Sequence, residues 1–493
     1  MSIWKDISEV EVRERRLHSI ISYNGTGKDL HEKAKAGYAA SLDRSYSQCA
    51  SCAESCASTI TARTKDSAVV FHSPVGCNAT VINFTIGIRS VSLSRNKQPY
   101  DVQSLCTNIQ EKDTIFGAEE KLRQTIREAD RRFHPKFIYI STSCASGIIG
   151  ENIEAVADEM EEELGYPIVP VYCEGFKSKI WSSGFDAGYH GLLRKIVKPP
   201  RKKQEDLVNI FAFEGTDTFT PLLDRMGLRT NYFVALASPE QLETMSEAAC
   251  STSICETLSL YVASALEERF GVPEIKSPPP YGTDWTDTWL REIGRVTGRE
   301  KEAEQVIAED RERCRDEIED LRGKLEGKKL YITAGDAFGH NLGNTARSLG
   351  VELVGITSLH HDLMTDNPAS VNSMDALVET AGDIRNFTIC NLQPYQIIKI
   401  LKKLKPDFLL CRHNGMNALG AKIGIPTLFE GDANYSCGYL GVIRLGRRLY
   451  EALQTRKLVE NIARHAELPY SDWWMNESDP FYFLEGGTNE QGN

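Results

Sequence analysis

The sequence predicts an α/β protein with three Rossmann-like domains whose parallel sheets surround a central metallocluster cavity. Short apolar runs of strand length alternate with amphipathic helical stretches along most of the 493 residues. Cysteines follow several of these runs, where a chain leaving a parallel sheet points its side chains into a crevice. A chain of this length is also expected to contain about two to four domains.

The first predicted domain covers residues 1–200, and its first fifty residues are polar. A basic stretch with two prolines, KIVKPPRKKQED (195–206), marks its end. Three apolar runs predict buried strands, and an amphipathic helix is predicted between the last two. These are VVFHSPVG (69–76), FIYIST (137–142), the helix EAVADEMEEELG (154–165) and YPIVPVYC (166–173).

The second predicted domain covers residues 201–327. Strands are expected at LVNIFAFEG (207–215) and TNYFVALA (230–237), and helices around LLDRMG and from Cys255 onward. The charged stretch 299–327 predicts a solvated or bridging helix.

The third predicted domain covers residues 328–493. Its expected strands are KKLYITAG (328–335), VELVGITS (351–358), PDFLLCR (406–412) and IPTLFEG (425–431). No strand is followed by GxGxxG, and no GxxxxGK[ST] occurs, so any ATP is expected to bind another subunit.

Composition narrows the function classes. The chain is 41% hydrophobic and 26% charged, which is ordinary for a soluble globular protein, and its net charge of -12 disfavours nucleic acid or anionic membrane as a main partner. It has no run of eighteen apolar residues, and its start has no apolar signal segment. A cytoplasmic location is therefore expected.

Thirteen cysteines, an odd number, are expected to be thiols and metal ligands in such a compartment, since disulfides are rare there. Cys52, Cys77 and Cys144 end strand-like runs and Cys255 opens a helix, so these four are the candidate ligands of buried iron-sulfur clusters. Cys49 and Cys56 flank Cys52 in a CxxCxxxC run, which alone would suggest a local cluster or a zinc site.

Several segments, in the same order, resemble the alpha subunit of the nitrogenase component 1 superfamily. HSPVGC (72–77) is similar to its HGPVGC segment, and TSCASGIIGENI (142–153) to its STCPVGLIGDDI segment. CETLSLYVASALEERFGVP (255–273) matches the helix that carries the cofactor cysteine. The segment KPDFLLCRHNGMNALGAKIGIPTLFEGDANYSCGYLG (405–441) looks closer to the cofactor-assembly scaffold, a paralogue of that subunit.

The resemblance implies two metal sites. Cys52, Cys77 and Cys144 take the positions of the three alpha-side ligands of the 8Fe-7S P-cluster, which a homologous beta-like subunit shares. Cys255 takes the position of the cysteine that anchors the large catalytic iron-sulfur cofactor. The implied assembly is an α2β2 heterotetramer that receives electrons from an ATP-dependent 4Fe-4S reductase homodimer.

The departures from nitrogenase concern the cofactor pocket. Trp181 and Phe185 replace the glutamine and histidine that line it, and Thr85 replaces a gating arginine, so donors needed to protonate dinitrogen are missing. Gly431 occupies the position of the histidine that ligates molybdenum in nitrogenase. An all-iron, carbide-type cofactor is therefore expected, with Cys437 as a candidate second ligand and a buried loop thiol as the alternative.

His360 and His361 follow a predicted strand. Solvent-facing histidines are the commoner outcome there, and the alternative is that they face the cavity as proton donors or ligands, with His361 the candidate catalytic residue.

Two functions fit these features. The chain most resembles the catalytic alpha-like (D) subunit of the methylthio-alkane reductases, which cleave small thioethers to methanethiol and a hydrocarbon, and Trp181 and Phe185 suit an apolar methylthio group. The alternative is a scaffold on which a nitrogenase-type cofactor matures before transfer. The first is preferred.

Overall fold

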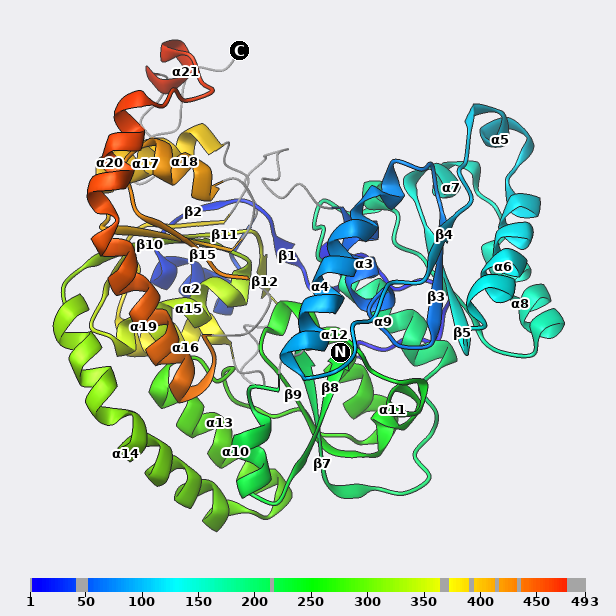
Figure 1. The fold of residues 1–493 in the computed structure, drawn as a ribbon, viewed down its shortest axis with the longest axis horizontal. Helices are drawn as coiled ribbons and strands as arrows, with labels where there is room; N and C mark the ends of the chain where they lie inside the picture. The colour runs from blue at the N-terminus through cyan, green and yellow to red at the C-terminus, as the bar shows by residue number, and fades with distance from the viewer. Residues whose placement is uncertain are drawn as a thin grey trace.

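A computed structural model describes residues 2–40, 52–212, 217–363, 372–389, 394–412, 416–431 and 436–476. Three mainly parallel sheets carry the fold, and each has its own place in the molecule (Figure 1). This arrangement confirms the predicted α/β class with parallel sheets.

The first sheet has four parallel strands in the order β4-β3-β5-β6. Three of them are the predicted apolar runs: β3 (Ser67–His72), β5 (Phe137–Thr142) and β6 (Ile168–Val171). The edge strand β4 (Ser104–Cys106) was not predicted. Helices α6 (Glu119–Phe133) and α8 (Ile153–Leu164) pack on one another and bury one apolar face each.

The second sheet has three parallel strands in the order β8-β7-β9. β7 (Gln204–Ala212) and β8 (Arg229–Val234) match the prediction, and β9 (Ala248–Ser253) leads into α12 (Glu256–Phe270). α12 lies against α9 (Ser183–Lys195), which in turn packs on α3 (Ala53–Thr61).

The third sheet has six strands in the order β15-β14-β10-β11-β13-β2. The four predicted strands are β10 (Lys329–Ala334), β11 (Glu352–Ser358), β14 (Phe408–Cys411) and β15 (Thr427–Phe429), all parallel. β13 (Phe387–Ile389) extends them in parallel, and β2 (Tyr23–Gly25) pairs with it in antiparallel register.

The first forty residues therefore do not stay with the first sheet. Besides β2, the short strand β1 (Ser19–Ile20) pairs with β12 (His361–Asp362), and α2 (Gly27–Lys35) packs on α16 (Ser373–Ala381). The division of the chain at residues 200 and 327 stays a prediction.

The charged stretch after residue 299 forms one long helix, α14 (Glu300–Leu325), along the edge of the molecule (Figure 1). It buries a narrow stripe of residues against α13 (Gly282–Thr297) and α19 (Gly438–Gln454), so it bridges rather than standing free in solvent. Among the described residues, no helix is both long and apolar enough to cross a membrane.

Candidate metallocluster sites

All five candidate ligand cysteines lie at the start of a helix. Cys52, Cys255 and Cys437 are the residues just before α3, α12 and α19. Cys144 is the first residue of α7 (Cys144–Ile149), and Cys77 opens a 3-10 turn (Cys77–Thr80). Helix N-termini carry partial positive charge and stabilise thiolates, which are the form that binds iron.

Two of these thiols converge beside Gly175, and a third lies near them. A side-chain carbon placed on Gly175 would lie 3.5 Å from Sγ of Cys52 and 3.6 Å from Sγ of Cys144. Cys77 belongs to the same group, because charge on Cys52 and Cys144 raises the pKa of its thiol. A larger residue at Gly175 would occupy the space between two sulfurs.

The three-cysteine site is open on one side. Cys52 and Cys77 are exposed and Cys144 is half-buried, so further donors can approach them. The alternative thiol Cys56 is buried in the hydrophobic core, and Cys49 lies outside the described residues.

Exposed apolar side chains lie on the segment that follows β3. Val75, Ile82, Ile86 and Leu93 each expose 60% or more of their surface along the turn at Cys77 and the helix α4 (Val81–Ser94). Large exposed apolar groups that cluster in this way mark protein interfaces. The open face of the three thiols thus borders a surface suited to a partner.

Glu54 is a site residue that the sequence analysis missed. Glu54 is 4% exposed and lies beside the Cys77 thiol, and burial raises the pKa of its carboxyl to about 7. Burial and the neighbouring Glu54 together raise the pKa of Cys77 to about 12. The acidic residue inside the CAESC run could have indicated this role, since a buried acid among thiols needs a polar or metal partner.

The second site contains Cys255 and Cys437, both buried. Charge on Cys255 raises the pKa of Cys437, and both thiols raise the pKa of Tyr281, so the three groups are neighbours. Residues 281 and 437 also form a backbone bridge. Burial raises the pKa of the Cys255 thiol to about 11, although Arg412 and two backbone N–H groups of α12 lower it.

Polar atoms around this second site lack hydrogen-bond partners within the described chain. Because such atoms are costly to bury alone, the site suits a polar or metallic occupant, and two soft thiolates suit iron. The atoms are Glu256 Oε1, Asp336 Oδ1, Asn341 Oδ1 and Ser358 Oγ.

Both histidines after β11 are buried, so the expectation that they face solvent is wrong. His360 is 1% exposed and His361 is fully buried, because β12 pairs with β1 from the N-terminal segment. His360 Nε2 lies 3.2 Å from Ser182 Oγ, and His361 Nδ1 lies 3.7 Å from Asp336 Oδ2. Two imidazoles are thus held beside buried carboxylates.

A buried arginine that no sequence pattern indicated connects these elements. Arg13 is fully buried and donates to Asp186 at 2.8 Å, to Asp362 at 3.1 Å and to the Thr257 carbonyl at 2.9 Å. Asp362 also pairs with His360. The arginine therefore connects the N-terminal segment, α9, α12 and β12 at one point.

The two aromatic residues predicted to line the cofactor pocket pack edge to face. Their ring centroids are 5.8 Å apart, Phe185 is buried and Trp181 is half-buried. Ser182, between them, contacts His360, which brings the start of α9 against the buried histidines. Gly431 follows β15 with no side chain, and residues 432–435 lie outside the described residues.

Residues 52–454 match the family model described as Nitrogenase component 1 type Oxidoreductase. The nitrogenase molybdenum-iron protein alpha chain of Methanococcus maripaludis is 27% identical over 419 residues, covering 80% of this chain and 84% of that protein. The nitrogenase iron-molybdenum cofactor biosynthesis protein NifE of Clostridium pasteurianum is 30% identical over 354 residues, covering 69% and 73%.

A solved structure titled "Nitrogenase Cp1 at pH 6.5" has the same fold. It superposes with a TM-score of 0.70 at 21% identity over 87% of this chain and 93% of that chain. The family model and the solved structure both match most of the sequence. The chain belongs to the nitrogenase component 1 type oxidoreductase family.

Proposed function

We propose that this chain is the catalytic alpha-like subunit of a nitrogenase-like reductase that cleaves the carbon-sulfur bond of small methylthio-alkanes. The observation that carries the proposal is the aromatic pair of Trp181 and Phe185, packed edge to face where α9 meets His360. These rings form an apolar wall at a position where dinitrogen reduction calls for polar donors. A methylthio group fits such a wall.

In this proposal Cys52, Cys77 and Cys144 hold the alpha half of a P-cluster. The convergence of Cys52 and Cys144 at Gly175, with Cys77 near both, and the open face of the three thiols support a site completed by three thiols of a homologous beta-like subunit in an α2β2 complex. Bound clusters supply electrons one at a time, received from an ATP-dependent 4Fe-4S reductase. The exposed apolar residues along α4 suit the subunit contact.

Cys255 and Cys437 hold the catalytic cofactor, which we propose to be all-iron. Gly431 offers no imidazole where a molybdenum ligand would stand, and the buried Cys437 thiol lies beside Tyr281 near Cys255. Glu256 Oε1 and Asn341 Oδ1, which have no hydrogen-bond partner among the described residues, suit a polar group held near them.

Reductive cleavage of a thioether consumes two electrons and two protons and yields a hydrocarbon and methanethiol. The carbon-sulfur bond breaks, and one proton goes to each fragment. We assign His361 Nδ1, which lies 3.7 Å from Asp336 Oδ2, as a proton donor to the site. A buried imidazole beside a carboxylate can take up a new proton after each transfer. Trp181 and Phe185 orient the substrate and exclude water.

The test is turnover by the complete complex. Purified without oxygen and given its reductase and MgATP, it should release methanethiol and ethane from ethyl methyl sulfide. Phe185→His should slow thioether turnover by about tenfold because it sets a polar ring against the apolar group, whereas Phe185→Leu, the matched apolar control, should retain most of it. Ammonia from dinitrogen with no methanethiol would contradict the proposal.

A scaffold for cofactor maturation is the second candidate. It is favoured by the resemblance to NifE, which is as high as 30% identity, and by Gly431 at the position of the missing ligand. A scaffold would turn over no thioether, and on mixing it would pass its cluster to an apo-enzyme and activate it. The same preparation therefore distinguishes the two candidates.

A further inference from the structure

Three buried side chains with metal-binding groups meet beside the third sheet. Each offers one ligand atom, and the three atoms lie within 4.8 Å of one another; the residues are Asp336, His360 and Asp362. The neighbouring parallel strands β10 and β11 lead to them, because Asp336 begins α15 (Asp336–Ser348) just after β10 and the other two follow β11. None is more than 6% exposed. One imidazole with two carboxylates is a ligand set that suits a divalent transition-metal ion.

His360 has the surroundings of a metal ligand. Its Nε2 lies 3.2 Å from Ser182 Oγ, and its Nδ1 lies 3.2 Å from Asp362 Oδ1. When Nε2 carries the ring proton and donates it to Ser182, the lone pair of Nδ1 is directed toward Asp362. Two ligand atoms at right angles, each about 2.1 Å from a metal, are roughly 3 Å apart, which matches this pair. Metal-bound imidazoles also donate their second N–H to a partner of this kind.

Asp362 is held in place as an ionised carboxylate. Arg13 donates to its Oδ2 at 3.1 Å, and Ser19 donates to its Oδ1, which keeps a second lone pair for an ion. Burial raises the pKa of this carboxyl, but charge on His360 and Arg13 outweighs burial and holds the pKa well below its usual range. A metal-binding carboxylate must be deprotonated, and Asp362 meets this condition.

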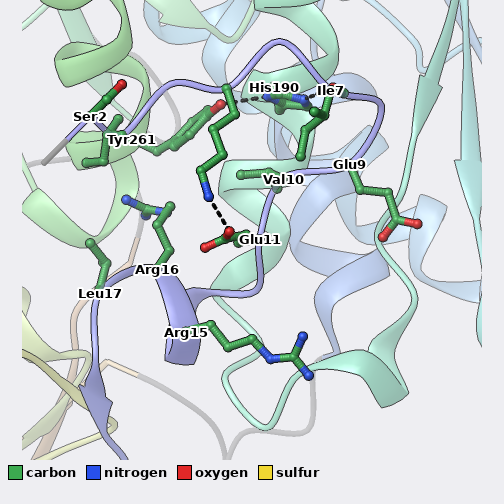
Figure 2. Close-up of a pocket in the computed structure, with 12 residues that line it drawn as sticks. Ser2, Ile7, Glu9, Val10, Glu11, Arg15, Arg16, Leu17, His190 and Tyr261 are labelled. Atoms are coloured by element: carbon green, nitrogen blue, oxygen red, sulfur yellow. Dashed lines mark hydrogen bonds and ion pairs between the residues drawn. The ribbon is translucent and has the colours of Figure 1, made fainter.

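The nearby guanidinium groups are paired with other carboxylates. Arg13 lies in α1 (Arg13–Arg16) and pairs with Asp186 as well as Asp362, and Arg16 of the same turn pairs with Asp186. Figure 2 shows Arg16 beside Tyr261, whose ring centroid lies 5.0 Å from Arg16 Cζ. Among the ion pairs of the described residues, neither arginine reaches Asp336.

Asp336 is the buried carboxylate that needs a cation. Its Oδ1 has no hydrogen-bond partner among the described residues. The imidazoles beside it are too far for hydrogen bonds, since His340 Nε2 lies 3.8 Å from Oδ1 and His361 Nδ1 lies 3.7 Å from Oδ2. Its place at the start of α15 favours the ionised form. Burying an ionised carboxylate without a bonded partner is costly, and a metal ion would remove that cost.

We propose that Asp336, His360 and Asp362 bind one divalent transition-metal ion of the Mn²⁺ or Fe²⁺ class, through Nδ1 of the histidine and one oxygen of each aspartate. An imidazole among the ligands favours such an ion over Mg²⁺ and Ca²⁺, which prefer oxygen alone. The ion connects the start of α15 to β12 and, through Arg13, to the N-terminal segment. This site is separate from the iron held by cysteines and does not depend on the reaction proposed for it.

The test uses the complex purified without oxygen, treated with EDTA and desalted, with manganese(II) chloride as the probe. Loss of the free Mn²⁺ signal in electron paramagnetic resonance should show one tightly bound ion per copy of this chain. Binding should persist in a large excess of magnesium chloride. Electron-nuclear double resonance of the bound ion should show coupling to a histidine nitrogen, because Nδ1 of His360 is a ligand.

Asp336→Asn and His360→Gln should each weaken Mn²⁺ binding by about tenfold or more, since loss of even an outer partner of a ligand costs about 10- to 100-fold. Asp113→Asn is the matched control and should bind as the parent does. Asp113 is also 6% exposed, but it lies in α5 (Glu111–Phe116) and pairs with Lys121. All three variants should retain the iron content of the parent.

Retained Mn²⁺ binding in both Asp336→Asn and His360→Gln would overturn the proposal. So would a parent complex that binds no Mn²⁺ in excess magnesium, or a bound ion without nitrogen coupling. Binding that appears only in Cys255→Ala would also overturn it, because these residues would then belong to the site of the cofactor. Absence of thioether turnover would count against the proposed function and would change none of these binding results.

Discussion

Gly184→Ala should separate two helices that set up the three-cysteine site. Gly184 lies in the first turn of α9, where α9 crosses α3. A side-chain carbon there would lie 1.9 Å from the Ala53 carbonyl oxygen and 2.7 Å from the Ala57 backbone nitrogen. Backbone atoms cannot swing away as a flexible side chain can, so α3 itself must move.

The cost follows from two opposing terms. Alanine in place of glycine inside a helix raises the free energy of unfolding by about 1 kcal/mol. Overpacking typically costs about 1–3 kcal/mol, and the upper end or more applies here because the backbone must shift, so we expect a net loss of about 2 kcal/mol or more in the free energy of unfolding. Because Cys52 directly precedes α3, the same movement should displace its sulfur from Cys144 and lower the iron bound at that site.

The assay combines urea unfolding of the first cooperative transition with iron analysis of the purified complex. Gly323→Ala is the matched control, because Gly323 also lies inside a helix, α14, and a side-chain carbon there would have nothing within 4 Å. The free energy of unfolding of this variant should rise by up to about 1 kcal/mol, and its iron content should not change. If Gly184→Ala were as stable as Gly323→Ala, with full iron content, the helix contact would not position the site.

Three further outcomes are expected. Cys255→Ala should lose the cofactor signal in electron paramagnetic resonance and keep the P-cluster signal, because the two sites use different cysteines. Cys77→Ala should lose the P-cluster signal and keep the cofactor signal. Loss of both signals in both variants would contradict this. Arg13→Ala should lower the free energy of unfolding by up to about 3–5 kcal/mol, since it removes one buried partner each from Asp186 and Asp362, and an unchanged urea midpoint would refute that role. Burial lowers the pKa of His190 to about 4, so the unfolded state binds more protons between pH 6.5 and 4, and stability falls as the pH falls through this window. His190→Gln should reduce the loss of stability over this pH window by up to about 3 kcal/mol. Parallel stability–pH profiles of parent and variant would contradict the lowered pKa of His190 as its cause.

Strongly apolar strands could be predicted from sequence, and weakly apolar ones could not. β3, β5, β7 and β10 are runs of large aliphatic or aromatic residues, and the structure places them in its sheets. β9 reads AACSTS, which has no large apolar side chain, and its strand character comes from pairing with β7. Tertiary contact outweighs local propensity in such strands.

Long-range pairing also explains what was missed at the sites. The burial of His361 depends on β1 pairing with β12 from more than three hundred residues away in the sequence, and no local pattern reports that pairing. The role of Arg13 likewise depends on Asp186 in α9. The cysteines, by contrast, could be selected by residue type and by their place after strand-like runs or, for Cys255, at the start of a helix, because few other side chains suit iron.

The two proposed metal centres are tested most directly by metal analysis and Mössbauer spectroscopy of the complex isolated without oxygen, together with its Cys255→Ala variant. We expect iron far in excess of molybdenum and vanadium, distributed over two spectroscopically distinct centres, one of which disappears in Cys255→Ala. Stoichiometric molybdenum in an active preparation would contradict the all-iron cofactor. Full iron content and turnover in Cys255→Ala would contradict the assignment of that cysteine as the cofactor ligand.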